Sequence, residues 1–507
     1  MRFLRYLRKS PTAKNASASY FATLSMGVSA FVSIPIAVHF LKKEEIGLWA
    51  VVSAVVNYLT WMDLGIGDGI GRKIAASVAA KDRAEINRWW TVSIFALSLL
   101  GMLLVVVGGA LTPWMISVFE VPSQLTSQAY ILFLGSIVLV GIGLPYRGAP
   151  GLLTAQQRFH WVSLAQGIAP WISILFFYLT LRSGWGMVSY VAGMAATVVF
   201  TGILYGFLIY RGPEKPGWDR RGVTVGRLKE LLGLSLNISV MGIVEAVFST
   251  LPAIILARYG GLAAVPIYTI TSRVPMFLAG LVRRTLWAFY PRLLRLHVTD
   301  QREALLRKHR YVGLLTAAVA LIAAGGVLGF NRMIVELLAG PGFYAGAATD
   351  AVLACIVLLD PVSRVFLCLL YLSGTMGRVA LVSVMAIVAA VIFSVFSYRH
   401  LGLPGLAGAM AILPLAMGTY GYFQGRRGGN FKRGEVSLAS AAIAAGGCGA
   451  LVLLSVVFPG IWESGGNAFQ IFGKAISIPG AATVAIACIL ISAGGFLGFN
   501  SLRRLRG

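Results

Sequence analysis

The stretch WWTVSIFALSLLGMLLVVVGGAL, residues 89–111, contains no charged side chain and is long enough to cross a bilayer as a helix. Such stretches recur along the 507-residue chain. A window of about 19 residues finds about fourteen of them. They fall near residues 16–40, 46–70, 89–111, 128–150, 160–181, 187–210, 232–257, 264–290, 311–330, 347–373, 379–398, 404–423, 436–458 and 476–499. Their connections are too short to fold as a soluble domain, so the sequence predicts an all-α polytopic membrane protein.

Composition and charge agree with this prediction. Hydrophobic residues make up 58% of the chain and charged residues only 12%, and the mean hydropathy is +0.81. The formal net charge is +25. With alternate loops assigned to opposite sides and the N-terminus inside, about 32 Lys and Arg fall on the inner side and about 7 on the outer. The charge therefore predicts a topology with both termini cytoplasmic, and not a nucleic-acid-binding face.

Two stretches resemble copies of each other, IPIAVHFLKKEEIGLW (34–49) and LPAIILARYGGLAAVPIY (251–268). Each has a proline in a predicted helix, then a polar break, then an aromatic residue early in the next helix. The copies are six spans apart, an even number, so both would have the same orientation in a parallel repeat. The predicted organisation is an N-lobe of spans 1–6 (1–211), a cytoplasmic linker (212–231), a C-lobe of spans 7–12 (232–424), and spans 13–14 with a basic tail (425–507).

Local features add three expectations. The end of the linker, from Val223 to Leu232, could form a short amphipathic helix at the inner face. Prolines within seven spans are expected to kink their helices; these are Pro35, Pro145, Pro170, Pro252, Pro275, Pro361 and Pro414. The cysteines lie in apolar stretches with no CxxC pair or metal-like spacing, so we expect small buried hydrophobic residues and no metal site; they are Cys355, Cys368, Cys448 and Cys488.

Three arginines lie within the eighth predicted span. Arg273 lies about three turns into this span, whereas Arg283 and Arg284 lie nearer its cytoplasmic end. Arg273 and Arg284 share a helix face and are about 16 Å apart along it. A guanidinium binds a diphosphate through bidentate hydrogen bonds, so all three are candidate ligands of a substrate diphosphate. The alternative for Arg283 and Arg284 is that they extend to the inner membrane interface.

Acidic residues within spans are candidates for ion coupling or for cavity charge. Glu245, in the seventh span, could titrate as the coupling site for H⁺ or Na⁺, or could neutralise Arg273. Asp360 precedes Arg364 by four residues, the favourable order for an intrahelical ion pair. Asp63 lies near the inner end of the second span.

Four motifs resemble those of the Wzx-like polysaccharide exporters in the multidrug/oligosaccharidyl-lipid/polysaccharide (MOP) flippase superfamily. They occur in the order that this family shows, and the resemblance covers about residues 15–425. The motifs are WMDLGIGDGIGRKIA (61–75), GLLTAQQRFHWVSLAQGIAPW (151–171), YTITSRVPMFLAGLVRRTLWAFYPRLLRL (268–296) and LLYLSGTMGRVALVSVM (369–385).

This resemblance implies a V-shaped fold of two pseudo-symmetric six-helix lobes plus two C-terminal helices. The implied function is alternating-access translocation of undecaprenyl-diphosphate-linked oligosaccharides across the bacterial inner membrane. The implied partners are that polyprenyl-diphosphate-linked oligosaccharide, membrane lipid, a polysaccharide polymerase and glycosyltransferases, with no nucleic acid. No cofactor is expected beyond a coupling H⁺ or Na⁺.

Other classes of protein fit less well. An enzyme would need clustered catalytic groups, and the 18 acids and 5 histidines are scattered. A channel would need a selectivity filter or a ring of like charge. A multidrug exporter of the same superfamily should carry acids for cationic drugs, whereas the charges within these spans are mainly basic. A lipid II flippase also stays open, although the first span lacks the basic residues of that group between Ala16 and Val38.

Overall fold

The computed structural model describes residues 11–61, 66–213, 215–372, 376–427, 465–471 and 474–479. Almost all of them are helical, and the chain divides into two compact units, Met1–Pro266 and Ile267–Gly507. Within the described ranges, ten helical segments are long and apolar enough to cross a membrane. The predicted all-α polytopic membrane protein is thus confirmed, while the total of about fourteen spans stays a prediction.

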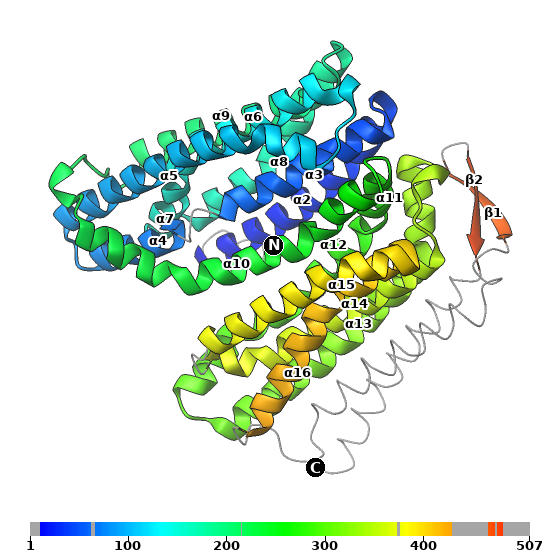
Figure 1. The fold of residues 1–507 in the computed structure, drawn as a ribbon. Helices are drawn as coiled ribbons and strands as arrows, with labels where there is room; N and C mark the ends of the chain where they lie inside the picture. The colour runs from blue at the N-terminus through cyan, green and yellow to red at the C-terminus, as the bar shows by residue number, and fades with distance from the viewer. Residues whose placement is uncertain are drawn as a thin grey trace. The chain divides into compact units, whose positions relative to one another are not determined.

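The first unit is built from long helices joined by short turns (Figure 1). Its α-helices are α2 (Pro11–Phe40), α3 (Lys43–Trp61), α4 (Ile66–Ala79), α5 (Arg83–Val118), α6 (Thr126–Gly143), α7 (Gly148–Ala155), α8 (Phe159–Arg182), α9 (Ser189–Tyr210) and α10 (Val225–Tyr259). Four short 3₁₀ helices connect them: η1 (Ser123–Leu125), η2 (Leu144–Arg147), η3 (Gly186–Val188) and η4 (Arg220–Gly222). Helix α2 packs along α8, α8 along α9, α5 along α6, and α10 along α3.

Close approach of two helices in this unit depends on glycine. A Cβ atom at Gly151 of α7 would lie 2.9 Å from the Cα atom of Gly71 in α4 and 3.0 Å from the carbonyl oxygen of Gly67. Backbone atoms cannot move aside as a flexible side chain can, so a larger residue at Gly151 would push the helices apart. Membrane helices commonly use small residues at such contacts.

The second unit is organised around α14, which packs against α12, α13, α15 and α16. The boundary between the units falls within α11 (Ala264–Thr271). The helices that follow are α12 (Arg273–Val298), α13 (Arg302–Ala339), η5 (Pro341–Phe343), α14 (Ala347–Leu372), α15 (Met376–Met410) and α16 (Ile412–Arg427). Both cysteines described, Cys355 and Cys368, are buried in α14, as predicted, and neither forms a disulfide.

A β-hairpin was not predicted. Strand β1 (Gly465–Ile471) pairs antiparallel with β2 (Lys474–Pro479), with Phe469 opposite Ile476. The hairpin begins after predicted span 13 and runs into the first residues of predicted span 14. Most of these two spans, and also Cys448 and Cys488, lie outside the described residues.

Several predicted spans contain breaks. The fourth is interrupted by η2, which contains Pro145, and the eighth is divided into α11 and α12 at Ser272. Pro275 lies in the first turn of α12, where its missing N–H costs no intrahelical hydrogen bond. Spans 11 and 12 meet where predicted, because Gly402 has a left-handed φ of 64° inside α15 and Pro404 follows it.

The predicted short helix from Val223 to Leu232 is wrong as a separate element. The Thr224 hydroxyl caps α10 by accepting a hydrogen bond from the N–H of Arg227 at 3.3 Å. The helix begins at Val225 and continues to Tyr259. The segment is therefore the first two turns of α10 and precedes the apolar part of that helix. Helix α10 packs on α3 and α4 of the first unit, and the predicted lobe boundaries stay a prediction.

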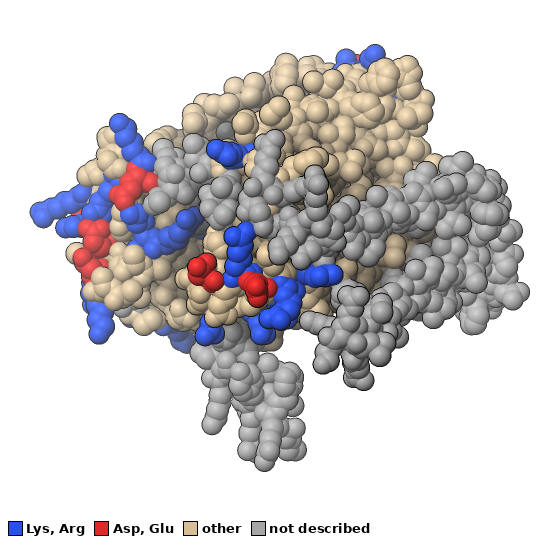
Figure 2. All heavy atoms as spheres, turned by 90° about the horizontal axis from the view of Figure 1, so that it is seen from below, with Lys and Arg blue, Asp and Glu red and all other residues tan. Residues whose placement is uncertain are grey.

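On the face of the molecule seen in Figure 2, charged side chains are gathered rather than evenly spread. Figure 2 shows Lys and Arg side chains close to Asp and Glu, and beside them a broad described surface with neither. Many large apolar side chains are exposed on the helices; on α15, for example, Met385 is 65% exposed and Ile392 is 70% exposed. Exposed apolar helix faces of this kind are what a lipid environment requires.

Candidate functional site

Helix α12 positions the predicted arginines on two different faces. Its buried residues, which include Val282 and Leu286, pack toward α13 and α14. Arg273 and Arg284 are exposed, as their three-turn separation predicts for two residues on one helix face. Arg283 lies about 80° around the helix from that face and is half-buried. The sequence motif therefore separates into two exposed arginines and one that turns toward the neighbouring helix.

Arg283 and Arg364 both pair with Asp360. Arg283 Nη1 lies 3.4 Å from Asp360 Oδ2, and Arg364 Nε lies 3.5 Å from Asp360 Oδ1. The side chain of Asp360 is only 6% exposed, whereas those of the two arginines are 28% and 22% exposed. The pair between Asp360 and Arg364 is the one that their spacing predicts. Each carboxylate oxygen thus faces a different guanidinium.

This ion-pair cluster lies beside a hydrophobic core. The buried core around it includes Val282 of α12 and Leu358 and Val362 of α14. A carboxylate in such surroundings needs compensating charge, because removing an ion from water is costly. Here two guanidinium groups compensate one carboxylate, so the cluster carries a net positive charge. We expect Asp360 to hold both arginines in place.

Aromatic side chains flank the arginine face of α12. Trp287, one turn after Arg284, is 55% exposed, and its ring lies 5.2 Å from that of Tyr290 at an interplanar angle of 52°. Exposed aromatic faces beside cationic groups suit an amphipathic ligand that has apolar sugar faces and an anionic group. Together, Arg273, Arg284 and Trp287 define what we term the α12 face.

The two remaining predicted residues, Glu245 and Asp63, fall within the residue range of the first unit. Glu245 is half-buried on α10 in the first unit. Asp63 lies outside the described residues. Within the described ranges, no three His, Cys, Asp or Glu side chains come together as metal ligands.

The second unit contains a second polar cluster, which was not predicted. Asn331 of α13 and Asp350 of α14 are both buried and hydrogen-bonded to each other. Asn331 was overlooked because the ninth span was predicted to end at residue 330, whereas α13 continues to Ala339. Asp350 lies inside the predicted tenth span. Because an acid within a span usually has a partner or a function, its position alone could have indicated this cluster.

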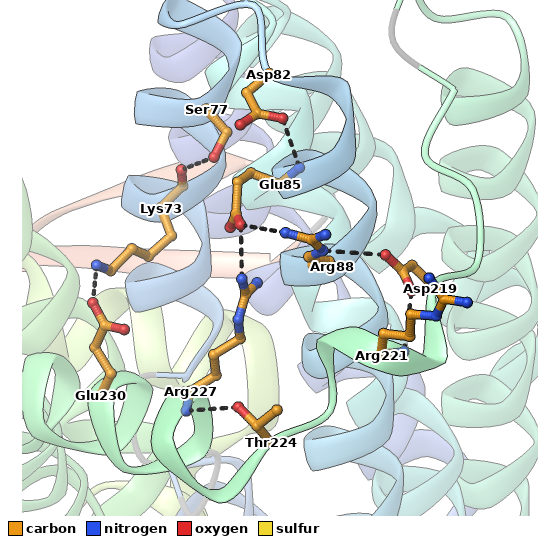
Figure 3. A network of polar contacts seen from close by, with 10 residues as sticks. All are labelled: Lys73, Ser77, Asp82, Glu85, Arg88, Asp219, Arg221, Thr224, Arg227 and Glu230. Atoms are coloured by element: carbon orange, nitrogen blue, oxygen red, sulfur yellow. Dashed lines mark hydrogen bonds and ion pairs between the residues drawn. The ribbon is translucent and has the colours of Figure 1, made fainter.

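A third cluster joins the linker to the first unit (Figure 3). Glu85 Oε1 accepts hydrogen bonds from Arg227 at 2.7 Å and from Arg88 at 3.0 Å. Arg88 also donates to Asp219 of the linker at 3.2 Å. Lys73 of α4 pairs with Glu230 of α10. These contacts join α4, α5, the linker and the start of α10, and therefore support the fold of this unit rather than a binding site.

Solved structures with a similar fold are membrane transporters. An inward-facing multidrug resistance MATE family transporter of the MOP superfamily is 15% identical, with a TM-score of 0.66 over 80% of this chain and 94% of that chain. An outward-facing MATE family transporter is 16% identical, with a TM-score of 0.59 over 83% and 97%. A MOP superfamily transporter from Pyrococcus furiosus is 16% identical, with a TM-score of 0.58 over 86% and 97%. The chain thus has the fold of the MOP-superfamily membrane transporters.

The family follows from the sequence match. The family model described as polysaccharide biosynthesis protein matches residues 12–297, more than half of the chain. The chain belongs to the polysaccharide biosynthesis protein family. The resemblance to Wzx-like MOP flippases is thereby confirmed in family and in fold. No curated protein matches the chain.

Proposed function

We propose that this protein is a flippase for polyprenyl-diphosphate-linked oligosaccharide repeat units, at the inner membrane of a bacterium. The observation that carries the proposal is the α12 face, where Arg273 and Arg284 are exposed on a membrane-spanning segment. A charged group in a span usually faces a cavity, a partner or an ion pathway. In a family named for polysaccharide synthesis, the matching ligand is the diphosphate that joins the sugar to its lipid.

The charges favour this substrate over a cationic drug. Helices α12 and α14 together contain six arginines and only two acids, Asp360 and the buried Asp350. A fixed guanidinium binds the two phosphates in a fork geometry while different sugars pass, which suits a transporter of variable repeat units. Lipid II has the same diphosphate linkage and is the alternative cargo. The protein acts as a transporter and not as an enzyme.

The proposal is tested in cells that lack the gene. Deletion should abolish surface polysaccharide and leave lipid-linked repeat units on the cytoplasmic leaflet. Complementation with the intact gene should restore surface polysaccharide. If cell-wall synthesis stops instead while surface polysaccharide continues, lipid II is the cargo. Normal surface polysaccharide and normal cell-wall synthesis in the deletion strain would contradict the flippase proposal.

The proposed orientation places both termini in the cytoplasm and leads to a topology prediction. Reporter fusions after Glu120 and Gly184 should report the outer side, because these turns follow spans that start from basic inner loops. Fusions after Lys81 and Trp218 should report the inner side. Alkaline phosphatase and green fluorescent protein provide opposite signals at each site. Reversed signals at two or more of the four sites would contradict the orientation.

A further inference from the structure

The missed polar cluster connects three parts of the second unit. The side-chain nitrogen Nδ2 of Asn331 donates to Asp350 Oδ1 at 2.7 Å and to the carbonyl oxygen of Thr271 at 2.9 Å. The hydroxyl of Tyr344 donates to Asp350 Oδ2 at 2.9 Å. Thr271 is the last residue of α11, Asn331 belongs to α13, Asp350 to α14, and Tyr344 to the turn between them. The cluster thus joins the end of a discontinuous helix to two continuous ones.

The cluster is buried and carries an acid. Asn331 and Thr271 are 0% exposed and Asp350 is 3% exposed. Both oxygens of Asp350 accept hydrogen bonds from neutral donors, and among the described residues no Lys, Arg or His forms an ion pair with it. An isolated buried carboxylate is costly unless a cation or a proton neutralises it.

An unsatisfied oxygen supplies the second, independent observation. Asn331 Oδ1 is buried and has no hydrogen-bond partner. Exchanging the positions of the nitrogen and the oxygen in the Asn331 amide would break two hydrogen bonds, because the nitrogen already donates to two oxygens. Since Oδ1 and Nδ2 share one amide carbon, this oxygen belongs to the same cluster as Asp350 and the Thr271 carbonyl. A buried acceptor without a donor needs a bound cation or a bound water.

The surrounding charges are few. Burial, and then the nearby Asp350, raise the pKa of Tyr344 above its usual range, so its hydroxyl stays a hydrogen-bond donor at neutral pH. Arg332 lies 5.7 Å from the Tyr344 ring and pairs with Glu336 at 2.8 Å. Arg273 of α12 is exposed, as are Arg399 and His400 of α15. The charged residues of α16 are Arg426 and Arg427, at its C-terminal end.

We propose that Asp350 and Asn331 form the binding site of the monovalent cation, Na⁺ or a proton, that drives transport. The ligands offered are carboxylate, amide and main-chain oxygens, which hard cations prefer. In transporters, carbonyl groups at breaks in membrane helices coordinate such ions, and the Thr271 carbonyl lies at such a break. A cation bound here would stabilise the contact between α11, α13 and α14, and so favour one conformation of the transport cycle.

The test is cation-dependent stability of the purified full-length protein in detergent, with no lipid-linked substrate present. The unfolding midpoint is measured against Na⁺ at fixed pH and ionic strength, and against pH at fixed Na⁺, because a ligand of the folded state raises the midpoint. Bound ²²Na⁺ is measured in parallel. Asp350→Asn removes the carboxylate, and Asn331→Leu removes the free oxygen. The matched control is Glu336→Gln, which removes an acid from the same helix that carries Asn331.

For a Na⁺ site, Na⁺ raises the midpoint of the wild-type protein and of Glu336→Gln, and both Asp350→Asn and Asn331→Leu lose this shift and the bound ²²Na⁺. For a proton site, falling pH raises the midpoint, Asp350→Asn loses that shift, and Asn331→Leu keeps it. Equal responses to Na⁺ and to pH in the wild type and in Asp350→Asn would overturn the proposal. The role in transport rests on the proposed function, but the binding measurement does not. Cation binding by a protein that does not flip lipid-linked oligosaccharide would therefore contradict the flippase proposal and support the cation site.

Discussion

Replacing Arg273 by alanine is expected to abolish surface polysaccharide while the protein stays inserted and folded. The side chain is exposed on the α12 face, so its removal leaves no cavity in the core. A hydrogen bond to a charged group contributes about 1.5–3 kcal/mol, so losing the diphosphate contact should slow translocation by about tenfold or more. Lipid-linked repeat units should then accumulate on the cytoplasmic leaflet, where they can be labelled and quantified.

The conservative variant separates charge from geometry. Arg273→Lys keeps the charge but loses the planar fork, so it should retain part of the polysaccharide output. Arg307→Ala, at an exposed arginine of α13 outside the α12 face, is the matched control and should have normal output. Normal output from well-expressed Arg273→Ala would remove this residue from the anion site.

Replacing Asp360 by alanine is expected to cause the largest loss of stability among the charged residues of the second unit. It leaves Arg283 and Arg364 facing each other without the carboxylate that each contacts. Removing one partner of a buried ion pair costs about 3–5 kcal/mol, and the partial exposure of both arginines reduces the expected cost to about 2–3 kcal/mol. The unfolding midpoint should fall by roughly 5–10 °C.

The measurement is thermal unfolding of the purified protein in detergent. Glu303→Ala, at an exposed acid in the first turn of α13, removes the same charge and should lower the midpoint much less. Arg364→Ala in the Asp360→Ala background should recover part of the loss, because it removes one unpaired guanidinium. An unchanged midpoint in Asp360→Ala would mean that the arginines do not depend on this carboxylate.

The sequence alone predicts much of the fold, because the length of an apolar stretch can be read from neighbouring residues without knowing any tertiary contact. The described parts of the first twelve apolar stretches are almost entirely helical, and the predicted boundary near residue 402 is the left-handed Gly402. The intrahelical pair of Asp360 and Arg364 was also predictable, since a spacing of four determines which side chains meet on a helix.

Contacts between helices could not be predicted in the same way. Arg283 meets Asp360 only because α12 and α14 pack with particular faces together, which one sequence does not reveal. The cluster of Asn331 and Asp350 depends on α13 continuing beyond its apolar stretch to Ala339. Hydropathy detects the apolar part of a helix and misses its polar end. The linker contacts of Glu85 and Arg227 likewise join segments far apart in the sequence.

The most direct test of the central claim is translocation by the purified protein in liposomes. Fluorescent polyprenyl-diphosphate-linked oligosaccharide is incorporated in both leaflets, and a membrane-impermeant quencher reports the fraction that reaches the outer surface. We predict translocation well above that of protein-free liposomes, lost in Arg273→Ala, and absent for a polyprenyl-linked sugar without the diphosphate. Transport of a cationic dye together with no movement of the lipid-linked oligosaccharide would contradict the assignment.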